Sequence, residues 1–251
     1  MKQIPVALQM YTLRNEAEKD FTGTLQRVAE LGYEGVELAG YGGFSPKELR
    51  EVLNNLNLQA VSSHIPLSEL RSSGDDVIHD QLELGSDYIV CPYLSPEERA
   101  EEDYIRLIDD LNSIGEKCFK EGVTLCYHHH DFELSKRPNG KTDLETILSE
   151  TNPLWVKAEF DIYWLTYAGE NPVEWLKRYQ GRTPLVHLKD MTTDGKRFFA
   201  ELGSGGVDLD AVLDFGMHHD VDWWIVEQDE CRIPPIDSVR MSLEYLRHHK
   251  S

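Results

Sequence analysis

Eight short apolar segments recur along the chain, and longer amphipathic segments separate them. Each apolar segment is rich in Val, Ile, Leu or aromatic residues, as a strand that is buried on both faces must be. Strands that alternate with helices form parallel sheets, because a parallel connection needs room for a crossover helix. The predicted strands are 4–10, 35–39, 58–63, 87–91, 123–127, 155–160, 185–188 and 223–226.

The segments between these strands have the apolar spacing of amphipathic helices. Predicted helices cover 21–31, 104–119, 208–217 and 237–246, and two more begin at Pro46 and Pro172. Eight such units in 251 residues favour closure of the sheet. The sequence therefore predicts an α/β fold, a single (β/α)8 TIM barrel in one domain over 1–251. No GxGxxG motif follows the first strand, which argues against a dinucleotide site.

Net charge limits the partners of this chain. With 25 basic and 45 acidic residues, the net charge of −20 would repel the phosphates of nucleic acids and anionic membranes. No run of about 18 apolar residues predicts a membrane span, and the first residues enter a strand without a signal-peptide pattern. We expect a cytoplasmic protein with a small-molecule partner, no nucleic acid and no membrane. A homodimer is possible, although no interface signature is visible.

Polar residues follow most of the predicted strands, at the rim where (β/α)8 barrels carry their active sites. Side chains that leave separate strands at one rim converge on one centre. Carboxylates and imidazoles without thiolates suit Mn²⁺, Co²⁺, Mg²⁺ or Zn²⁺, and so many like charges need a cation between them. We therefore predict one divalent metal ion. The candidate residues are Glu37, His64, His128, His130, Glu133, Asp161, His187, Lys189 and Glu227.

Several of these residues also have a simpler explanation. Asp161 precedes a helix and is a suitable N-cap. The three consecutive histidines alternate in and out of the barrel, so His129 is expected to face away from the site. Lys189 either orients a substrate oxygen or pairs with Asp190.

Four segments resemble the xylose isomerase-like TIM barrel superfamily, and within it the sugar phosphate isomerase/epimerase branch. They are 127–133, 161–164, 186–190 and 201–205. The resemblance covers nearly the whole chain. It implies one divalent metal ion held by Glu, Asp, His and Glu at the ends of strands five to eight.

Asp161, His187 and Glu227 match the last three of these ligands. Strand five does not end in Glu here. Glu133, which follows shortly after that strand, is therefore predicted as the first ligand, with His128 or His130 as the alternative.

Such a metal would polarise the carbonyl group of a bound sugar, so that Glu133 or Glu227 removes the neighbouring proton. We predict a metal-dependent sugar isomerase/epimerase that acts through an enediolate on a ketose, keto-sugar or inositol-like substrate. Loss of a β-hydroxyl from the same intermediate would make the protein a dehydratase or lyase similar to inosose dehydratase. An apurinic-site endonuclease is a remote alternative, because that branch holds three metals and needs a basic surface.

The substrate is predicted to contact six residues near the metal. Basic residues are scarce at the predicted rim, which favours an unphosphorylated sugar. The glycine-rich stretch 203–206 is the exception, since its backbone N–H groups are able to cradle a phosphate. The predicted contacts are His64, His128, His130, Trp164, Lys189 and Glu37.

Overall fold

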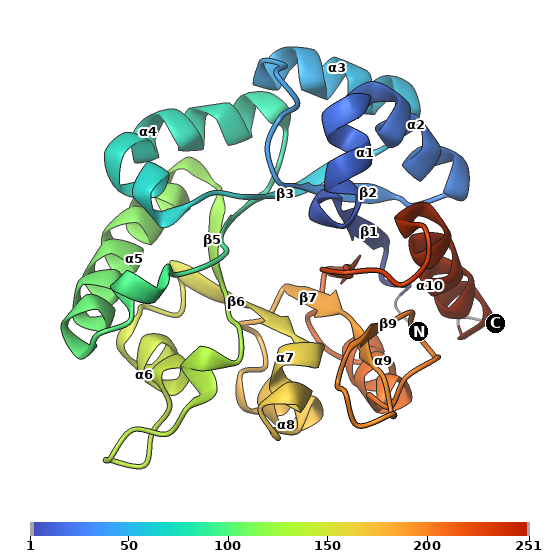
Figure 1. Ribbon diagram of the computed structural model, residues 1–251. Helices are drawn as coiled ribbons and strands as arrows, with labels where there is room; N and C mark the ends of the chain where they lie inside the picture. The colour runs from blue at the N-terminus through green and yellow to red at the C-terminus, as the bar shows by residue number, and fades with distance from the viewer. Residues whose placement is uncertain (1–2, 250–251) are drawn as a thin grey trace.

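Eight parallel strands form a closed barrel with helices around it, as the computed structural model shows for residues 3–249 (Figure 1). Strand β1 pairs with both β2 and β10, which closes the sheet. The order around the barrel is β1-β10-β7-β6-β5-β4-β3-β2. The prediction of a (β/α)8 barrel is confirmed. The barrel strands are β1 Val6–Gln9, β2 Gly35–Leu38, β3 Gln59–His64, β4 Tyr88–Cys91, β5 Thr124–His128, β6 Val156–Asp161, β7 Leu185–Leu188 and β10 Trp223–Val226.

Six of the helices lie where the apolar spacing predicts them. These are α2 Phe21–Leu31, α3 Pro46–Leu56, α5 Glu101–Glu121, α8 Pro172–Arg178, α9 Leu209–Met217 and α10 Pro235–His249. Helix α3 begins with a capping box, in which the Ser45 hydroxyl accepts from the Glu48 N–H and the Glu48 carboxylate accepts from the Ser45 N–H. Gly32 ends α2 in the left-handed conformation, with φ of 93°, where a side chain would be strained.

Four helices were not predicted: α1 Arg14–Lys19, α4 Leu67–Leu84, α6 Asp143–Glu150 and α7 Ile162–Tyr167. Helix α4 is interrupted at Ser73, whose φ of −141° and ψ of 28° are not helical, so its apolar spacing is broken. The other three have eight residues or fewer, too few for a clear periodic signal. A small hairpin, β8 Asp190–Met191 with β9 Phe199–Ala200, follows β7.

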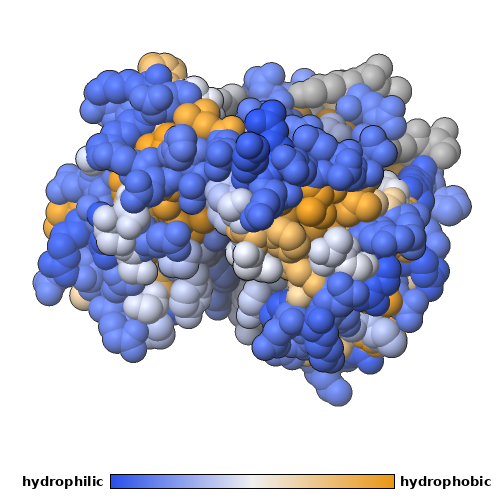
Figure 2. Space-filling model, turned by 90° about the horizontal axis from the view of Figure 1, so that it is seen from above, coloured by the Kyte–Doolittle hydropathy of each residue, from blue (hydrophilic) through white to orange (hydrophobic). Residues whose placement is uncertain are grey.

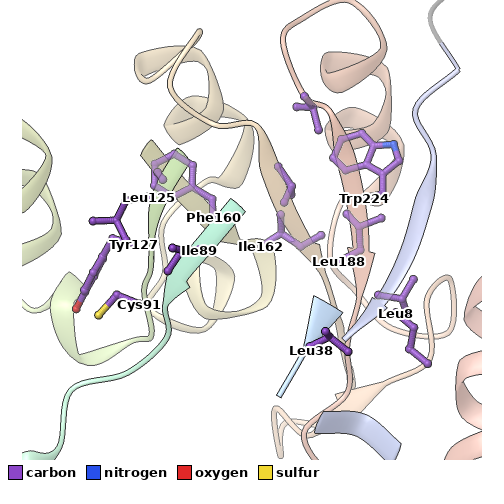
Figure 3. Packing of buried hydrophobic residues seen from close by; sticks show 14 of the residues in the cluster. Leu8, Leu38, Ile89, Cys91, Leu125, Tyr127, Phe160, Ile162, Leu188 and Trp224 are labelled. Atoms are coloured by element: carbon purple, nitrogen blue, oxygen red, sulfur yellow. The ribbon is translucent and has the colours of Figure 1, made fainter. Parts of the chain in front are cut away.

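Two hydrophobic clusters lie on opposite faces of the barrel wall. The larger fills the space between the strands and the helices, and Figure 3 shows part of it. The smaller plugs the barrel interior and contains Ala7, Val61, Val90, Cys126, Leu185, Trp223 and Ile225. The interior is therefore a packed core at the amino ends of the strands.

Inward-facing positions change from apolar to polar along the same strands. Two residues after Cys126 comes His128, and two residues after Ile225 comes Glu227. Because side chains alternate with a period of two, these polar residues point into the barrel above the apolar plug. This change places the candidate site at the carboxyl rim.

Hydrophilic residues cover most of the face seen in Figure 2, with smaller hydrophobic patches between them. None of the helices formed by residues 3–249 is both long and apolar enough to cross a membrane.

Candidate metal centre and substrate cavity

Asp161, His187 and Glu227 meet at the carboxyl rim, with one ligand atom of each within 4.8 Å of the others. Asp161 is the register partner of His187 on the neighbouring strand. The Nδ1 atom of His187 lies 2.9 Å from Oε2 of Glu227, which directly follows β10. The three residues that match the family's last three ligands are therefore brought together.

Asp161 serves both as a helix cap and as a member of this group. Its Oδ1 accepts hydrogen bonds from the N–H groups of Tyr163 and Trp164, at 2.9 and 3.1 Å, and so begins α7. Its Oδ2 is buried and forms an ion pair with the ammonium of Lys189. His129, whose ring faces away from the cavity as expected, accepts the Asp161 N–H at Nε2 and so fixes the carboxylate from behind.

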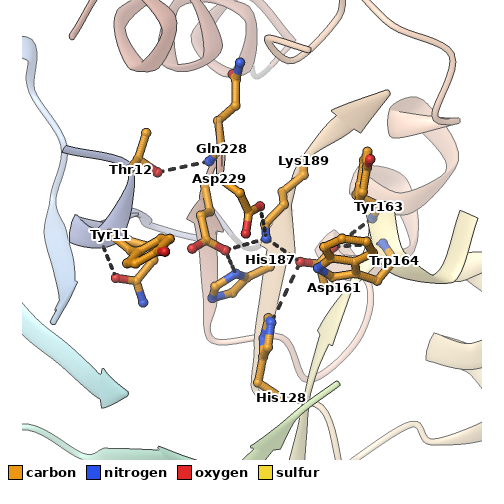
Figure 4. A network of polar contacts seen from close by, with 12 residues as sticks. Tyr11, Thr12, His128, Asp161, Tyr163, Trp164, His187, Lys189, Gln228 and Asp229 are labelled. Carbon is orange, nitrogen blue, oxygen red and sulfur yellow. Dashed lines mark hydrogen bonds and ion pairs between the residues drawn. The ribbon is translucent and has the colours of Figure 1, made fainter. Parts of the chain in front are cut away.

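Lys189 extends its ammonium into this group of acids (Figure 4). Its Nζ lies 2.9 Å from Asp161 Oδ2, 2.6 Å from Glu227 Oε2 and 2.8 Å from Asp229 Oδ2. The side chain is only 1% exposed. Lys189 therefore forms ion pairs, but not with Asp190, and its three partners leave it no role as a direct substrate contact.

The carboxylate of Asp190 instead organises the glycine-rich loop after β9. It accepts the N–H groups of Gly203, Gly205 and Val207 at 3.0, 2.9 and 3.0 Å. A side chain at Gly205 would place its Cβ only 2.2 Å from Asp190 Oδ1. The N–H groups of 203–206 are thus all occupied, because those of Ser204 and Gly206 donate to the carbonyls of Glu201 and Met191.

Glu37 lies below the cavity rather than in its wall. The carboxylate accepts from Gln9 Nε2 at 2.8 Å and from Ser62 Oγ at 2.6 Å. It also pairs with Nε2 of His187 at 2.6 Å and with Nε2 of His64 at 3.0 Å. With all these partners and no exposed surface, Glu37 holds the two imidazoles in place and, unlike four of the other predicted substrate contacts, does not line the cavity.

Glu159 is a candidate metal ligand that sequence reasoning did not select. Its Oε2 lies 3.0 Å from His128 Nδ1, 3.1 Å from His64 Nε2 and 3.3 Å from His187 Nε2. These four residues form a second group able to hold a metal ion. The sequence does indicate this position, because Glu159 precedes Asp161 by two residues and therefore lies on the same face of β6.

The carboxylates set the charge of the buried imidazoles. Burial by itself lowers the pKa of His64, but Glu37 and Glu159 outweigh it and raise the pKa to about 9. Burial is likewise outweighed at His187, whose pKa is raised well above its ordinary value by the same two acids. At His128 burial dominates, reinforced by the nearby His187, and lowers the pKa well below its ordinary value. His64 and His187 are thus cationic, and His128 is neutral.

The charges and donor atoms of this centre fit a divalent cation. Without a metal, its five carboxylates face three cationic groups, Lys189, His64 and His187; a bound cation would take the place of the His187 proton, because only a neutral imidazole binds a metal. The donors are carboxylate oxygens and imidazole nitrogens, which suit Mg²⁺, Mn²⁺, Co²⁺ and Zn²⁺. Oε1 of Glu159 is buried without a hydrogen-bond partner in the described chain, a costly state that a cation relieves. The carboxylates are those of Glu37, Glu159, Asp161, Glu227 and Asp229.

Glu133, the residue predicted as the first ligand, belongs to neither group. Its Oε1 accepts the Tyr127 hydroxyl at 2.7 Å, and its Oε2 accepts the His130 N–H at 2.8 Å. Tyr127 belongs to the outer cluster, between the barrel and the helices. The carboxylate is therefore directed behind the barrel wall, and the structure contradicts its assignment as a metal ligand and base.

Replacing Glu133 with Gln is expected to leave the affinity for Mn²⁺ or Zn²⁺ unchanged, because this side chain lies outside both groups of ligands. Isothermal titration of metal-free E133Q and wild-type protein measures this. If E133Q keeps the wild-type circular dichroism spectrum but loses much of its metal affinity, Glu133 must be assigned as a metal ligand after all.

The same variant also has an expected pH signature. Burial raises the pKa of Glu133 from 4.5 to about 7. Between these values the folded protein holds a proton that the unfolded chain has lost, so stability falls as pH rises through this window. The Gln side chain of E133Q does not titrate, so this variant does not lose stability in this way. Its free energy of unfolding relative to wild type should therefore increase by on the order of 3 kcal/mol between pH 4.5 and pH 8. Urea unfolding at both pH values measures this difference, from which effects common to both proteins cancel.

A cavity of about 950 Å³ opens above the metal centre. His64, His128, His130 and Trp164 line it, as predicted for substrate contacts, together with Glu227. Its volume lies near the upper end of the roughly 300–1,000 Å³ that is usual for small-molecule sites. Glu37 and Lys189 do not line it. Residues of loops and turns that no sequence pattern singled out complete the wall, among them Tyr11, Tyr41, Arg99, Phe132 and Asp229.

Comparison with known proteins agrees with this geometry. The family model described as xylose isomerase-like TIM barrel matches residues 25–249. The chain therefore belongs to the xylose isomerase-like TIM barrel family.

Relatives of known structure or activity place the chain among enzymes. An inosose dehydratase of Geobacillus kaustophilus is 27% identical over 273 residues, covering 90% of this chain and 87% of that protein. The structure of a sugar phosphate isomerase/epimerase from Parabacteroides distasonis has a TM-score of 0.83 and 26% identity, covering 98% of this chain and 94% of the other. An IolI protein with a bound zinc atom shares the fold, with a TM-score of 0.76, 16% identity and 98% coverage of both chains.

Proposed function

We propose that this protein is a divalent-metal-dependent lyase that removes water from a polyhydroxy ketone of the inosose or keto-sugar class. The observation that carries the proposal is the pairing of one carboxylate with imidazoles at the cavity floor. Glu227 faces the cavity from β10, whereas the inward residue at the end of β5 is His128. An epimerase that works with two carboxylates, as the family resemblance implies, needs an acid at that place on β5.

Elimination of water needs one base and one acid in different positions. Glu227 and His64 contact different parts of His187, its ring edge and its ring face. Glu227 contacts its Nδ1 at 2.9 Å, and the His64 ring stacks on it with centroids 5.6 Å apart. Glu227 is placed to accept the proton next to the substrate carbonyl. When bound, the metal supplies Lewis-acid polarisation of that carbonyl.

His64 is placed to protonate the departing hydroxyl. Its Nε2 is held by Glu37 and Glu159, while its Nδ1 has no hydrogen-bond partner among residues 3–249 and the ring lines the cavity. In the proposed step the C–H bond breaks and its proton passes to Glu227. The electrons of the C–H bond form a carbon–carbon double bond as the C–O bond breaks. The hydroxyl then leaves as water with the proton of His64.

The similarity to inosose dehydratases supports this reaction over its alternative. The second candidate is a sugar isomerase or epimerase that uses the same base. The Parabacteroides structure, named a sugar phosphate isomerase/epimerase, favours it, and His128 is then the residue placed to return the proton to carbon.

One NMR experiment distinguishes the two reactions. Metal-loaded protein is incubated in D₂O with inososes, ketoses and keto-glycosides. We expect the loss of a hydroxyl-bearing CH signal and the appearance of a dehydrated enol or diketone product. Glu227→Gln is expected to slow this reaction by about 10²- to 10⁴-fold. Glu174→Gln is the matched control, since Glu174 is exposed, pairs only with Lys177 at the surface and does not line the cavity, and we expect it to leave the rate unchanged.

Deuterium incorporation without elimination would identify the isomerase or epimerase instead. The assignment of Glu227 as the base fails if E227Q dehydrates the substrate as fast as wild type, and the proposed reaction fails if metal-loaded wild type dehydrates none of these compounds.

A further inference from the structure

Arg99 is the only Lys or Arg residue that lines the cavity within the described part of the chain. It belongs to the loop between β4 and α5, and its guanidinium lies 3.4 Å above the ring of Phe132. The Nε and Nη2 atoms both donate to the carbonyl of Leu94, at 3.0 and 2.8 Å. One edge and one face of the guanidinium are thus fixed by the protein, which removes much of the entropy that binding a ligand would otherwise cost.

Arg99 forms no ion pair among residues 3–249, although its charge offsets part of the rise in the pKa of the buried Glu133 carboxyl. No carboxylate oxygen among residues 3–249 lies within 4.0 Å of it, and Nη1 donates no hydrogen bond to any of these residues. Arg71, in contrast, binds Glu98 and Asp110, each at 2.7 Å. In a chain with a net charge of −20, an arginine that faces a cavity without a counter-ion points to an anion supplied by a ligand.

The position of Arg99 shows where such an anion would lie relative to the metal centre. The ring of Phe132, on which Arg99 lies, stacks on His130 with centroids 5.7 Å apart and an interplanar angle of 8°. The ring of His130 in turn lies 5.1 Å from that of His128, at the cavity floor. Arg99 is therefore separated from His128, the nearest imidazole of the centre in this series, by the two rings of Phe132 and His130.

We propose that Arg99 binds a carboxylate or phosphate at the end of the substrate remote from the reacting carbons, so that the substrate is an acidic sugar or cyclitol. The position of the reacting carbons rests on the proposed function. The other sites for an anion are closed, because Lys189 is surrounded by three carboxylates and the glycine-rich loop binds Asp190. The sequence-based expectation was an unphosphorylated sugar, which this proposal keeps if the bound group is a carboxylate and replaces if it is a phosphate.

Anion binding is tested without turnover. Metal-loaded wild type, Arg99→Met, Arg99→Lys and Arg71→Met are titrated calorimetrically with inorganic phosphate and with malonate. We expect binding to wild type and R71M, a loss of affinity of about tenfold or more in R99M, and a smaller loss in R99K. The anion that binds more tightly identifies phosphate or carboxylate as the substrate group. Thermal unfolding checks that each variant is folded.

The proposal is overturned if wild type binds neither anion, or if R99M binds it as tightly as R71M does. Its failure is separable from that of the proposed function. Arg99-dependent anion binding without dehydration of any acidic keto-sugar or inosose leaves the anion site standing and refutes the reaction. Equal dehydration of neutral and acidic substrates, equally affected by R99M, refutes the anion site and leaves the reaction standing.

Discussion

Replacing Asp161 with Asn is expected to weaken the binding of Mn²⁺ or Zn²⁺ by more than about a hundredfold, since removal of groups that merely support metal ligands already costs 10- to 100-fold. The substitution keeps the oxygen that caps α7 through the N–H groups of Tyr163 and Trp164. It replaces Oδ2, which faces the centre, with an amide nitrogen that cannot bind a cation. Calorimetric titration of the metal-free protein measures the affinity.

Asp229→Asn is the matched control for this experiment. Asp229 contacts Lys189 at 2.8 Å, as Asp161 does at 2.9 Å, but only Asp161 belongs to a metal-ligand group. The same chemical change at Asp229 should therefore reduce affinity far less than at Asp161. Equal losses in the two variants would mean that the total charge of the centre, and not a specific ligand, holds the metal. Full metal content in D161N would refute the site.

Replacing Lys189 with Met is expected to destabilise the metal-free protein by about 3–5 kcal/mol, the usual effect of removing one partner of a buried ion pair. The ammonium is 1% exposed and neutralises three carboxylates. For a chain of this size we expect Tm to fall by roughly 10 °C. Added Mn²⁺ should raise Tm more in K189M than in wild type, because the cation then replaces the missing positive charge.

Lys177→Met serves as the control, since Lys177 is largely exposed and forms one ion pair with Glu174, the kind of pair that contributes little stability. Differential scanning calorimetry of the three proteins, with and without metal, measures these effects. A Tm of K189M within a degree of that of K177M would show that Lys189 does not hold the acidic centre together.

The strand pattern predicted the fold because, in this chain, the residues that favour each strand or helix locally are also those that the packing of the barrel requires. Buried parallel strands must be apolar along their whole length, and crossover helices must be amphipathic, so both leave a signal in short windows of sequence. The helices that escaped prediction are short or, like α4, interrupted at Ser73. The composition of the rim was also readable, since Asp161, His187 and Glu227 stand at or just after strand ends.

The sequence by itself determined the eight barrel strands and six of the helices, that the sheet closes, and that Asp161, His187 and Glu227 lie at its carboxyl rim. The direction of each side chain beyond the end of a strand was decided only by the tertiary structure. Glu133 turns behind the barrel wall to Tyr127, Lys189 reaches Asp229 across the rim, and Arg99 enters the cavity from a loop. The period of two fixes direction only within a strand. Past its last residue, direction depends on loop packing and on charges that are distant in sequence.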